Sequence, residues 1–147
     1  RRVLFRSDGL AMVVNDGKYG YIITAGEVVV PLEFDGAEHF SEGLAAMKVN
    51  GSWGFMDTSG KIVIDPQYLP RIWGSPMIFC EGLAAVRTET GTGFINKSGE
   101  MVVPAVYSSA EDFAYGLARV GSLSNPDYVN KRGEVIWSKN NITSKNE

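Results

Sequence analysis

Five residues of this chain have side chains suited to binding another molecule. Trp73, Ile72 and Arg71 are consecutive, and tryptophan and arginine are the residue types enriched at the energetic centres of protein interfaces. Trp53 and Tyr19 offer further flat rings, on which a sugar or a peptide could stack. These residue types predict recognition of a partner rather than the making or breaking of bonds.

The residues that could catalyse a reaction form no such pattern. Asp8, Glu42 and Glu81 recur at one position of a repeat, and paired carboxylates can transfer protons. A residue repeated in register more often has a role in the repeat itself, so we expect these carboxylates to accept backbone N–H groups. One histidine, His39, and one distant cysteine, Cys80, do not make a zinc site. We therefore expect no catalytic residues, no metal and no cofactor.

The elements that position these residues come from an internal repeat. The tripeptide Gly-Leu-Ala occurs four times, and a second glycine follows 17 residues after the first glycine in every copy. The first glycines are Gly9, Gly43, Gly82 and Gly116, and the second are Gly26, Gly60, Gly99 and Gly133. Four copies with one constant internal spacing indicate one structural unit repeated four times.

Each copy is predicted to form three β-strands. In the first strand, Ala45 and Met47 alternate as expected of one face, and their counterparts in the other copies are also small or apolar, so we assign this face to the core. The second strand begins at the step Trp53-Gly54 and ends at a turn that Asp or Asn opens and Gly closes, typical of a hairpin. The third strand is apolar, and a nearby proline such as Pro66 should end its pairing.

These motifs resemble those of the bacterial WG repeat family. Its units contain Glu-Gly-Leu-Ala, Trp-Gly before an aromatic residue, Asp-x-x-Gly and a Val-Ile-Pro stretch, and the copy from Phe40 to Tyr68 is the clearest match. The Trp-Gly pair is complete only at Trp53-Gly54, with Tyr19-Gly20 in the first copy. The resemblance covers roughly residues 7 to 137 and implies a repeated binding module rather than an enzyme.

A unit of about 35 residues is too small to fold alone, so its apolar face must be covered by the next copy. We expect an all-β fold of four tandem antiparallel three-stranded units in an open, curved, stacked array. A closed propeller-like or trefoil-like arrangement is the alternative. The expected boundaries are a single domain over 8–137, with repeats at about 8–40, 41–79, 80–113 and 114–137, and a polar tail over 138–147.

Residues 1–7 resemble the translation of a sequencing-adapter oligonucleotide, and we expect them to be a non-native leader. The single cysteine fits a reducing compartment. This favours the bacterial cytoplasm. The cell surface is the alternative, because the native N-terminus is expected to be missing behind the non-native leader.

One link between copies is longer than the others. The chain advances 6 residues from Phe34 to Phe40, but 11 from Tyr68 to Phe79. The 5 extra residues fall in the segment that contains Trp73, and insertions in repeat proteins often lie on the binding face. This segment is the strongest candidate for a binding loop, with coverage of an edge between copies as its alternative role.

The leading hypothesis for function is a non-catalytic module that binds a protein or peptide. A carbohydrate-binding or cell-wall-binding repeat that uses Trp53 and Tyr19 is the alternative, and an enzyme with an unrecognised site is a further one. The net charge of −3 and the absence of any Lys/Arg run longer than two argue against nucleic acid as a partner. No apolar run approaches the roughly 18 residues of a membrane helix, so we expect no membrane insertion.

Overall fold

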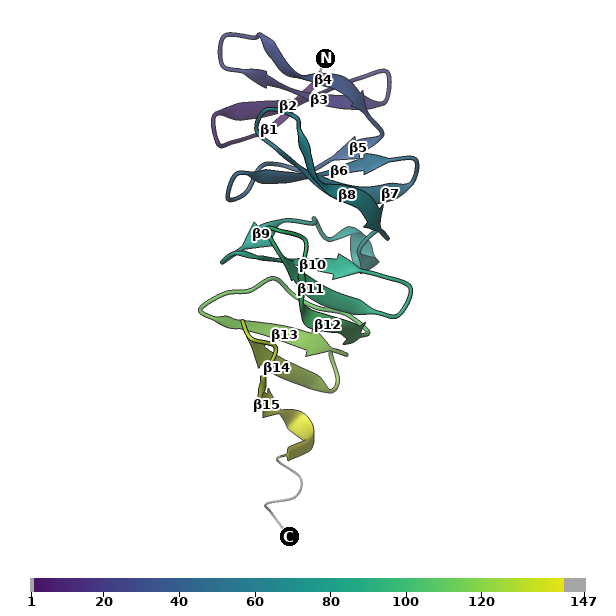
Figure 1. The fold of residues 1–147 in the computed structure, drawn as a ribbon, viewed down its shortest axis with the longest axis vertical. Helices are drawn as coiled ribbons and strands as arrows, with labels where there is room; N and C mark the ends of the chain where they lie inside the picture. Colours follow the sequence, from purple (N-terminus) through teal and green to yellow (C-terminus); the bar gives the residue numbers. More distant parts are fainter. Residues whose placement is uncertain (1, 142–147) are drawn as a thin grey trace. The chain divides into compact units, whose positions relative to one another are not determined.

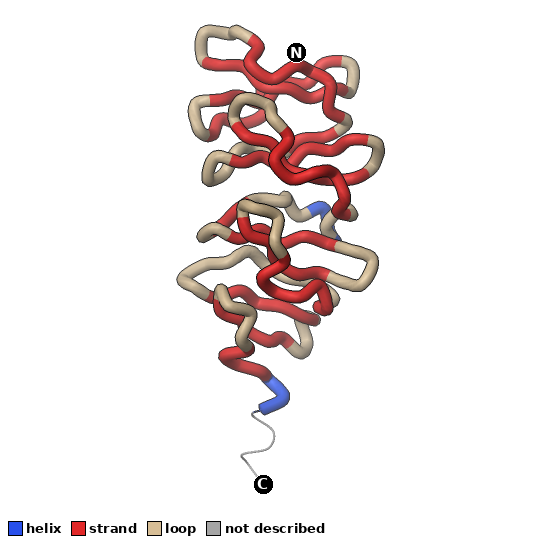
Figure 2. The backbone as a smooth tube through the Cα atoms, viewed as in Figure 1, coloured by secondary structure: helices blue, strands red, loops and turns tan. Residues whose placement is uncertain are grey.

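The computed structural model describes the backbone of residues 2–141 and the side chains of residues 8–140. Over this range the chain is built from short β-strands and contains no α-helix, which confirms the all-β prediction (Figures 1 and 2). Four antiparallel sheets form, and none of them closes into a barrel. The chain divides into two compact units, Arg1–Phe79 and Cys80–Glu147, and each contains two repeats.

The first unit contains two four-stranded sheets, with strand orders β1-β2-β3-β4 and β5-β6-β7-β8. The strands of the first sheet are β1 (Arg2–Ser7), β2 (Leu10–Asn15), β3 (Lys18–Ile23) and β4 (Val28–Phe34). Those of the second are β5 (Gly36–Ala37), β6 (Leu44–Val49), β7 (Ser52–Asp57) and β8 (Ile62–Tyr68). The backbone of residues 2–7 is thus paired with β2, while the expected foreign origin of that segment stays a prediction.

The second unit repeats this plan with orders β12-β11-β10-β9 and β13-β14-β15. Its strands are β9 (Phe79–Cys80), β10 (Leu83–Arg87), β11 (Thr92–Asn96), β12 (Met101–Tyr107), β13 (Leu117–Gly121), β14 (Pro126–Asn130) and β15 (Val135–Ser138). The three strands predicted for each repeat are present in all four copies. The short extra strands β5 and β9 were not predicted from the sequence. They arise because backbone groups of the links pair with the open edge of the next repeat's first strand.

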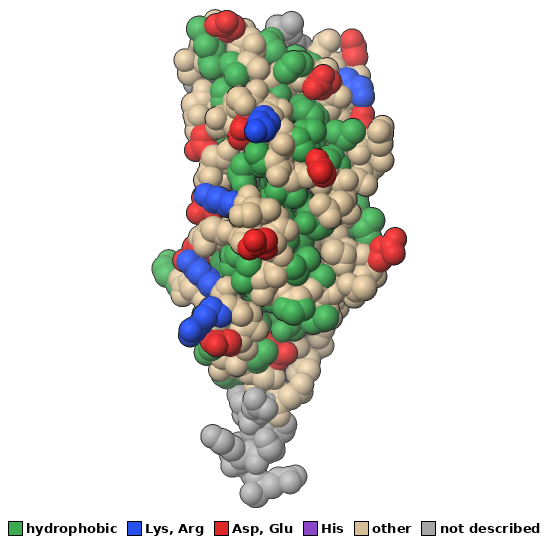
Figure 3. Space-filling view, viewed as in Figure 1, with side chains coloured by type: hydrophobic (Ala, Val, Ile, Leu, Met, Phe, Trp, Pro, Cys, Tyr) green, Lys and Arg blue, Asp and Glu red, His purple; other side chains and the backbone are tan. Residues whose placement is uncertain are grey.

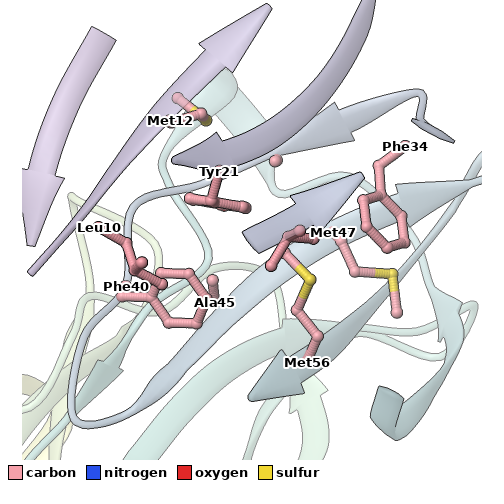
Figure 4. Close-up of a cluster of buried hydrophobic side chains, with 10 residues drawn as sticks. Leu10, Met12, Tyr21, Phe34, Phe40, Ala45, Met47 and Met56 are labelled. Atoms are coloured by element: carbon pink, nitrogen blue, oxygen red, sulfur yellow. The ribbon is translucent and has the colours of Figure 1, made fainter. Parts of the chain in front are cut away.

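Both faces of the first strand are buried in the first three repeats, in β2, β6 and β10. Ala45 and Met47, predicted to lie in the core, are covered, and so are Leu44 and Ala46 on the opposite face of β6. In the first unit, residues of β2 and β3 pack against residues of β6 and β7 in one apolar cluster (Figure 4). In these three repeats the first strand is buried on both faces rather than on one. In the fourth repeat, Leu117 of β13 is 38% exposed.

In each unit, an aromatic residue of the link packs against an aromatic residue of the preceding repeat. The ring of Phe40, from the link, lies edge-to-face against Tyr21 of β3 with centroids 4.8 Å apart. Phe113 and Phe94 form the same pair in the second unit at 4.7 Å. Edge-to-face geometry is favourable because the positive ring edge meets the negative face of its partner. The recurrence shows that the link aromatic anchors one repeat on the repeat before it.

The third strand does not end at its proline, contrary to the sequence prediction. In β8, Ile64 pairs with Phe55 and Tyr68 pairs with Trp53. Between these two pairs the chain advances four residues in β8 but only two in β7. The extra residues bulge outward around Pro66, and the ladder resumes beyond it. A bulge leaves a residue out of the ladder, so the missing proline N–H breaks no bond there.

Candidate functional site

The insertion loop presents its tryptophan to solvent. Ile72–Gly74 form a single 3₁₀ turn, in which Trp73 is 94% exposed and Ile72 is 36% exposed. The Nη1 atom of Arg71 donates a hydrogen bond of 2.5 Å to the Pro76 carbonyl oxygen, which bridges the base of the loop. The loop is thus held by its own arginine while its largest apolar side chain makes little contact with the protein.

The backbone of Trp73 is in the left-handed region, with φ of 64° and ψ of 17°. A bulky residue is rare in this conformation, which brings Cβ close to the following carbonyl oxygen and costs about 1–2 kcal/mol. Glycine would adopt the same φ without that cost. A tryptophan that is both exposed and strained contributes little to folding.

A pocket of about 190 Å³ lies beside the loop, within the first unit. Its lining residues come from the link after β4, from β7 and from the insertion loop. They are Glu38, Trp53, Pro70, Arg71, Gly74, Ser75 and Met77. The structure therefore brings together two of the five predicted site residues, Trp53 and Arg71, and places Ile72 and Trp73 next to this pocket in the chain.

Trp53 is held by its cross-strand neighbours. It lies opposite Lys48 on β6 and Tyr68 on β8, and a Cβ at Gly36 would come within 3.3 Å of its Cη2 atom. The indole is therefore packed over the backbone of β5 and is only partly exposed. Tyr19 has the equivalent position in the first repeat, where it packs against the apolar cluster and does not line the pocket.

Glu38 is the pocket residue that the sequence analysis missed. Burial raises the pKa of its carboxyl group, and the positive charge of Arg71 opposes that rise only in part. Its backbone is fixed from both sides, because its N–H donates to the Ala46 carbonyl oxygen and its carbonyl oxygen accepts from the Tyr21 hydroxyl. The only sequence signal was Glu111, an acidic residue at the same link position before the fourth repeat.

The Tyr21 hydroxyl that contacts this link is itself buried. Burial raises the pKa of the phenol, and the nearby Glu38 carboxylate raises it further. The phenol therefore stays protonated and acts as a hydrogen-bond donor at neutral pH. It orients the Glu38 backbone, and through it the carboxylate, toward the pocket.

Asp8 and Glu81, two of the three recurring carboxylates, have the structural role expected of them. Asp8 Oδ2 accepts the Gly43 backbone N–H at 3.0 Å, and Glu81 Oε2 accepts the Gly116 N–H at 3.0 Å. Both acidic residues have left-handed φ and precede a left-handed glycine, a pairing typical of type I′ turns. Each carboxylate thus joins the first turn of one repeat to that of the next one in its unit.

Two further features concern metals and membranes. Among the side chains of residues 8–140, no group of three or more His, Cys, Asp or Glu could hold a metal ion. No helix within residues 2–141 has the length and apolar character needed to cross a bilayer.

Figure 3 shows acidic and basic side chains scattered over the face in view, between hydrophobic ones.

Comparison with family models matches the WG containing repeat at residues 19–53, 53–68 and 93–121. The comparison with curated proteins finds no match. The matched segments cover more than half of the 147 residues and include Trp53-Gly54, the second-strand turn and the bulged third strand of the second repeat. On this evidence the chain belongs to the WG-containing repeat family.

Proposed function

We propose that this chain is a non-catalytic repeat module that binds a protein or peptide through the insertion loop and the adjacent pocket. The observation that supports it is Trp73, a strained tryptophan that is 94% exposed on a loop found in only one of the three links. Burying a tryptophan ring against a partner removes a large apolar area from water, which is a main source of binding energy.

The pocket offers little for catalysis. It is lined by one carboxylate, and His39, the only histidine, is not among its lining residues. A nucleophile with an adjacent base would be the usual mark of covalent catalysis. Ser75 is the only hydroxyl residue in the lining.

The geometry gives less support to a carbohydrate-binding repeat. That function would use the faces of Trp53 and Tyr19 for stacking, and both side chains are only partly exposed because their neighbours pack against them. Trp73, in contrast, is almost fully exposed on a short loop next to a charged pocket. A partner with both apolar and polar groups, as in a peptide, fits this combination best.

A Trp73→Gly variant tests the proposal. Glycine relieves the left-handed strain but makes the unfolded chain more flexible, so we expect the free energy of unfolding to change by less than about 1 kcal/mol. Peptides selected from a displayed random library on the unaltered protein should bind the variant at least about tenfold more weakly, since a tryptophan anchor is worth about 2 kcal/mol or more.

Leu123→Ala is the matched control, because Leu123 is an exposed apolar residue in the other unit. This variant should bind the selected peptides with unchanged affinity. Equal binding of the peptides by Trp73→Gly and by the unaltered protein would show that the loop is not the binding site. A large loss of stability in Trp73→Gly would show that the loop has a structural role.

A further inference from the structure

The pocket beside the insertion loop combines apolar walls with one half-buried acidic group. Trp53, Pro70 and Met77 form apolar parts of the lining, and Glu38 contributes the carboxylate. A lysine or arginine side chain has the matching composition, since its apolar stem covers hydrophobic surface while its charged end seeks an anion. We infer that this pocket accepts a basic side chain of the bound peptide, an inference that rests on the proposed function.

The apolar walls favour a cation with a long stem over a free inorganic ion. Met77 is almost fully buried at the base of the loop, and the Trp53 indole is fixed over Gly36. An ammonium or guanidinium group near an indole face is attracted by the ring quadrupole, by about 0.5–2 kcal/mol depending on desolvation. The pocket volume of about 190 Å³ is small, which suits one side chain rather than a whole cofactor.

Arg71 also lines the pocket, and its charge must be weighed against that of Glu38. Its guanidinium donates to the Pro76 carbonyl oxygen, so part of its hydrogen-bonding capacity serves the loop. Its charge lowers the pKa of the Glu38 carboxyl, but the effect of burial is larger and the pKa is raised overall. Burial therefore disfavours the charged form of the carboxyl, and a cationic group bound beside it would stabilise that form.

The net charge of the protein supports the same ligand. At −3 it attracts cations at long range, although this effect is weak and screened by salt. Arg71 of the loop is the charged group that acts on the Glu38 carboxyl, and the Tyr21 hydroxyl of β3 contacts the Glu38 carbonyl oxygen. His39 follows Glu38 in the chain, and Lys48 of β6 lies opposite Gly36, two residues before it. Tyr21 stays neutral near pH 7, and the carboxylate is the only anionic group in the pocket lining.

Nitrogen-15 NMR titration of the whole chain with Nα-acetyl-lysine methylamide tests the inference. The three tryptophan indole N–H signals serve as probes, because Trp53 lines the pocket, Trp73 is on the loop and Trp137 belongs to the other unit. We expect the Trp53 signal to shift with millimolar affinity and the Trp137 signal to stay in place. The same compound acetylated at Nε should cause at most a tenth of the shift.

Glu38→Gln removes the charge with almost no change in shape, and it should weaken binding of the lysine compound at least tenfold. Glu38→Asp keeps the charge and should retain the preference for the unacetylated compound. Binding should also fall as the pH falls through the raised pKa of Glu38, because protonation removes the anion. If Glu38→Gln fails to fold, the comparison of the two lysine compounds on the unaltered protein still decides the matter.

Three results would overturn the inference: no shift at Trp53, equal shifts with both lysine compounds, or a shift with Nα-acetyl-glutamate methylamide instead, which would assign the pocket to an anion at Arg71. Failure of the proposed function is distinguishable. If Trp73→Gly weakens binding of the selected peptides and Glu38→Gln does not, the proposal of a binding loop is kept and the inference of a basic side chain in the pocket is wrong. If neither variant weakens them, both are wrong.

Discussion

The glycine of the Trp-Gly step is required by a close approach of two backbones. A Cβ at Gly54 would lie 2.4 Å from the Ile64 carbonyl oxygen, and equally short contacts exist at Gly20 and Gly93. In all three repeats this carbonyl lies in the third strand, next to the bulge. The fourth repeat has Asp127 at this position, and there β15 is short and lacks the second bulge.

Gly54→Ala should therefore destabilise the protein strongly. The added methyl group meets backbone rather than a movable side chain, so β7 and β8 must separate or lose the bulge, at an expected cost of about 3 kcal/mol or more. Urea unfolding followed by circular dichroism measures this change. Asp127→Ala, at the equivalent position without the bulge, should cost less than about 1 kcal/mol. Equal costs would contradict the role given to the bulge.

At the scale of the element, the hairpin turns follow directly from their side chains. Asp57 Oδ1 accepts the Ser59 hydroxyl at 2.6 Å, the Ser59 N–H at 2.9 Å and the Lys61 N–H at 3.1 Å. Asn96 makes the corresponding backbone contacts in the third repeat. The Asp/Asn-x-x-Gly pattern predicted these turns because the interactions are local and need no knowledge of the tertiary fold.

The Asp57 turn predicts how the stability of the protein depends on pH. The Ser59 hydroxyl hydrogen bond, followed by the backbone N–H groups, lowers the pKa of Asp57. A carboxyl whose pKa is lower in the folded state stabilises the fold above its unfolded pKa of about 3.9, and this contribution disappears as the pH falls through the folded pKa. Asp57→Asn keeps the acceptor oxygen and removes the titration.

The urea midpoint of the unaltered protein should therefore fall more between pH 6 and pH 3 than the midpoint of Asp57→Asn. The other carboxylates titrate in both proteins and cancel in this comparison. At pH 6 the variant should keep the same circular dichroism spectrum, since asparagine occupies this position in two other repeats. Equal falls of the two midpoints would show that the turn does not favour the charged form.

Other elements could not be predicted from local patterns. The third strand was expected to end at Pro66, but β8 continues because the bulge depends on the absence of a Cβ on the neighbouring strand. The pocket joins Glu38, Trp53 and Arg71 from three segments, and only the tertiary fold brings them together. The sequence identified Trp53 and Arg71 by residue type, while Glu38 had no distinguishing local motif.

Each of the two units contains a buried apolar cluster between its two sheets. The cluster of the first unit and that of the second share no residues. In repeat proteins, stability is approximately a sum of terms for each repeat and for each pair of neighbours. Perturbations of these two clusters should therefore act independently.

The link aromatics Phe40 and Phe113 allow this to be tested, because both are buried and pair edge-to-face with one ring. Replacing either by leucine keeps most of the volume and removes the aromatic pair, at an expected cost of about 1–2 kcal/mol. The double variant should lose the sum of the two single losses to within about 0.5 kcal/mol, as expected for sites without shared partners. The free energies come from urea unfolding of the three variants. A coupling energy above about 1 kcal/mol would mean that the two clusters respond as one core, and the description as a sum of separate repeat interfaces would then be wrong.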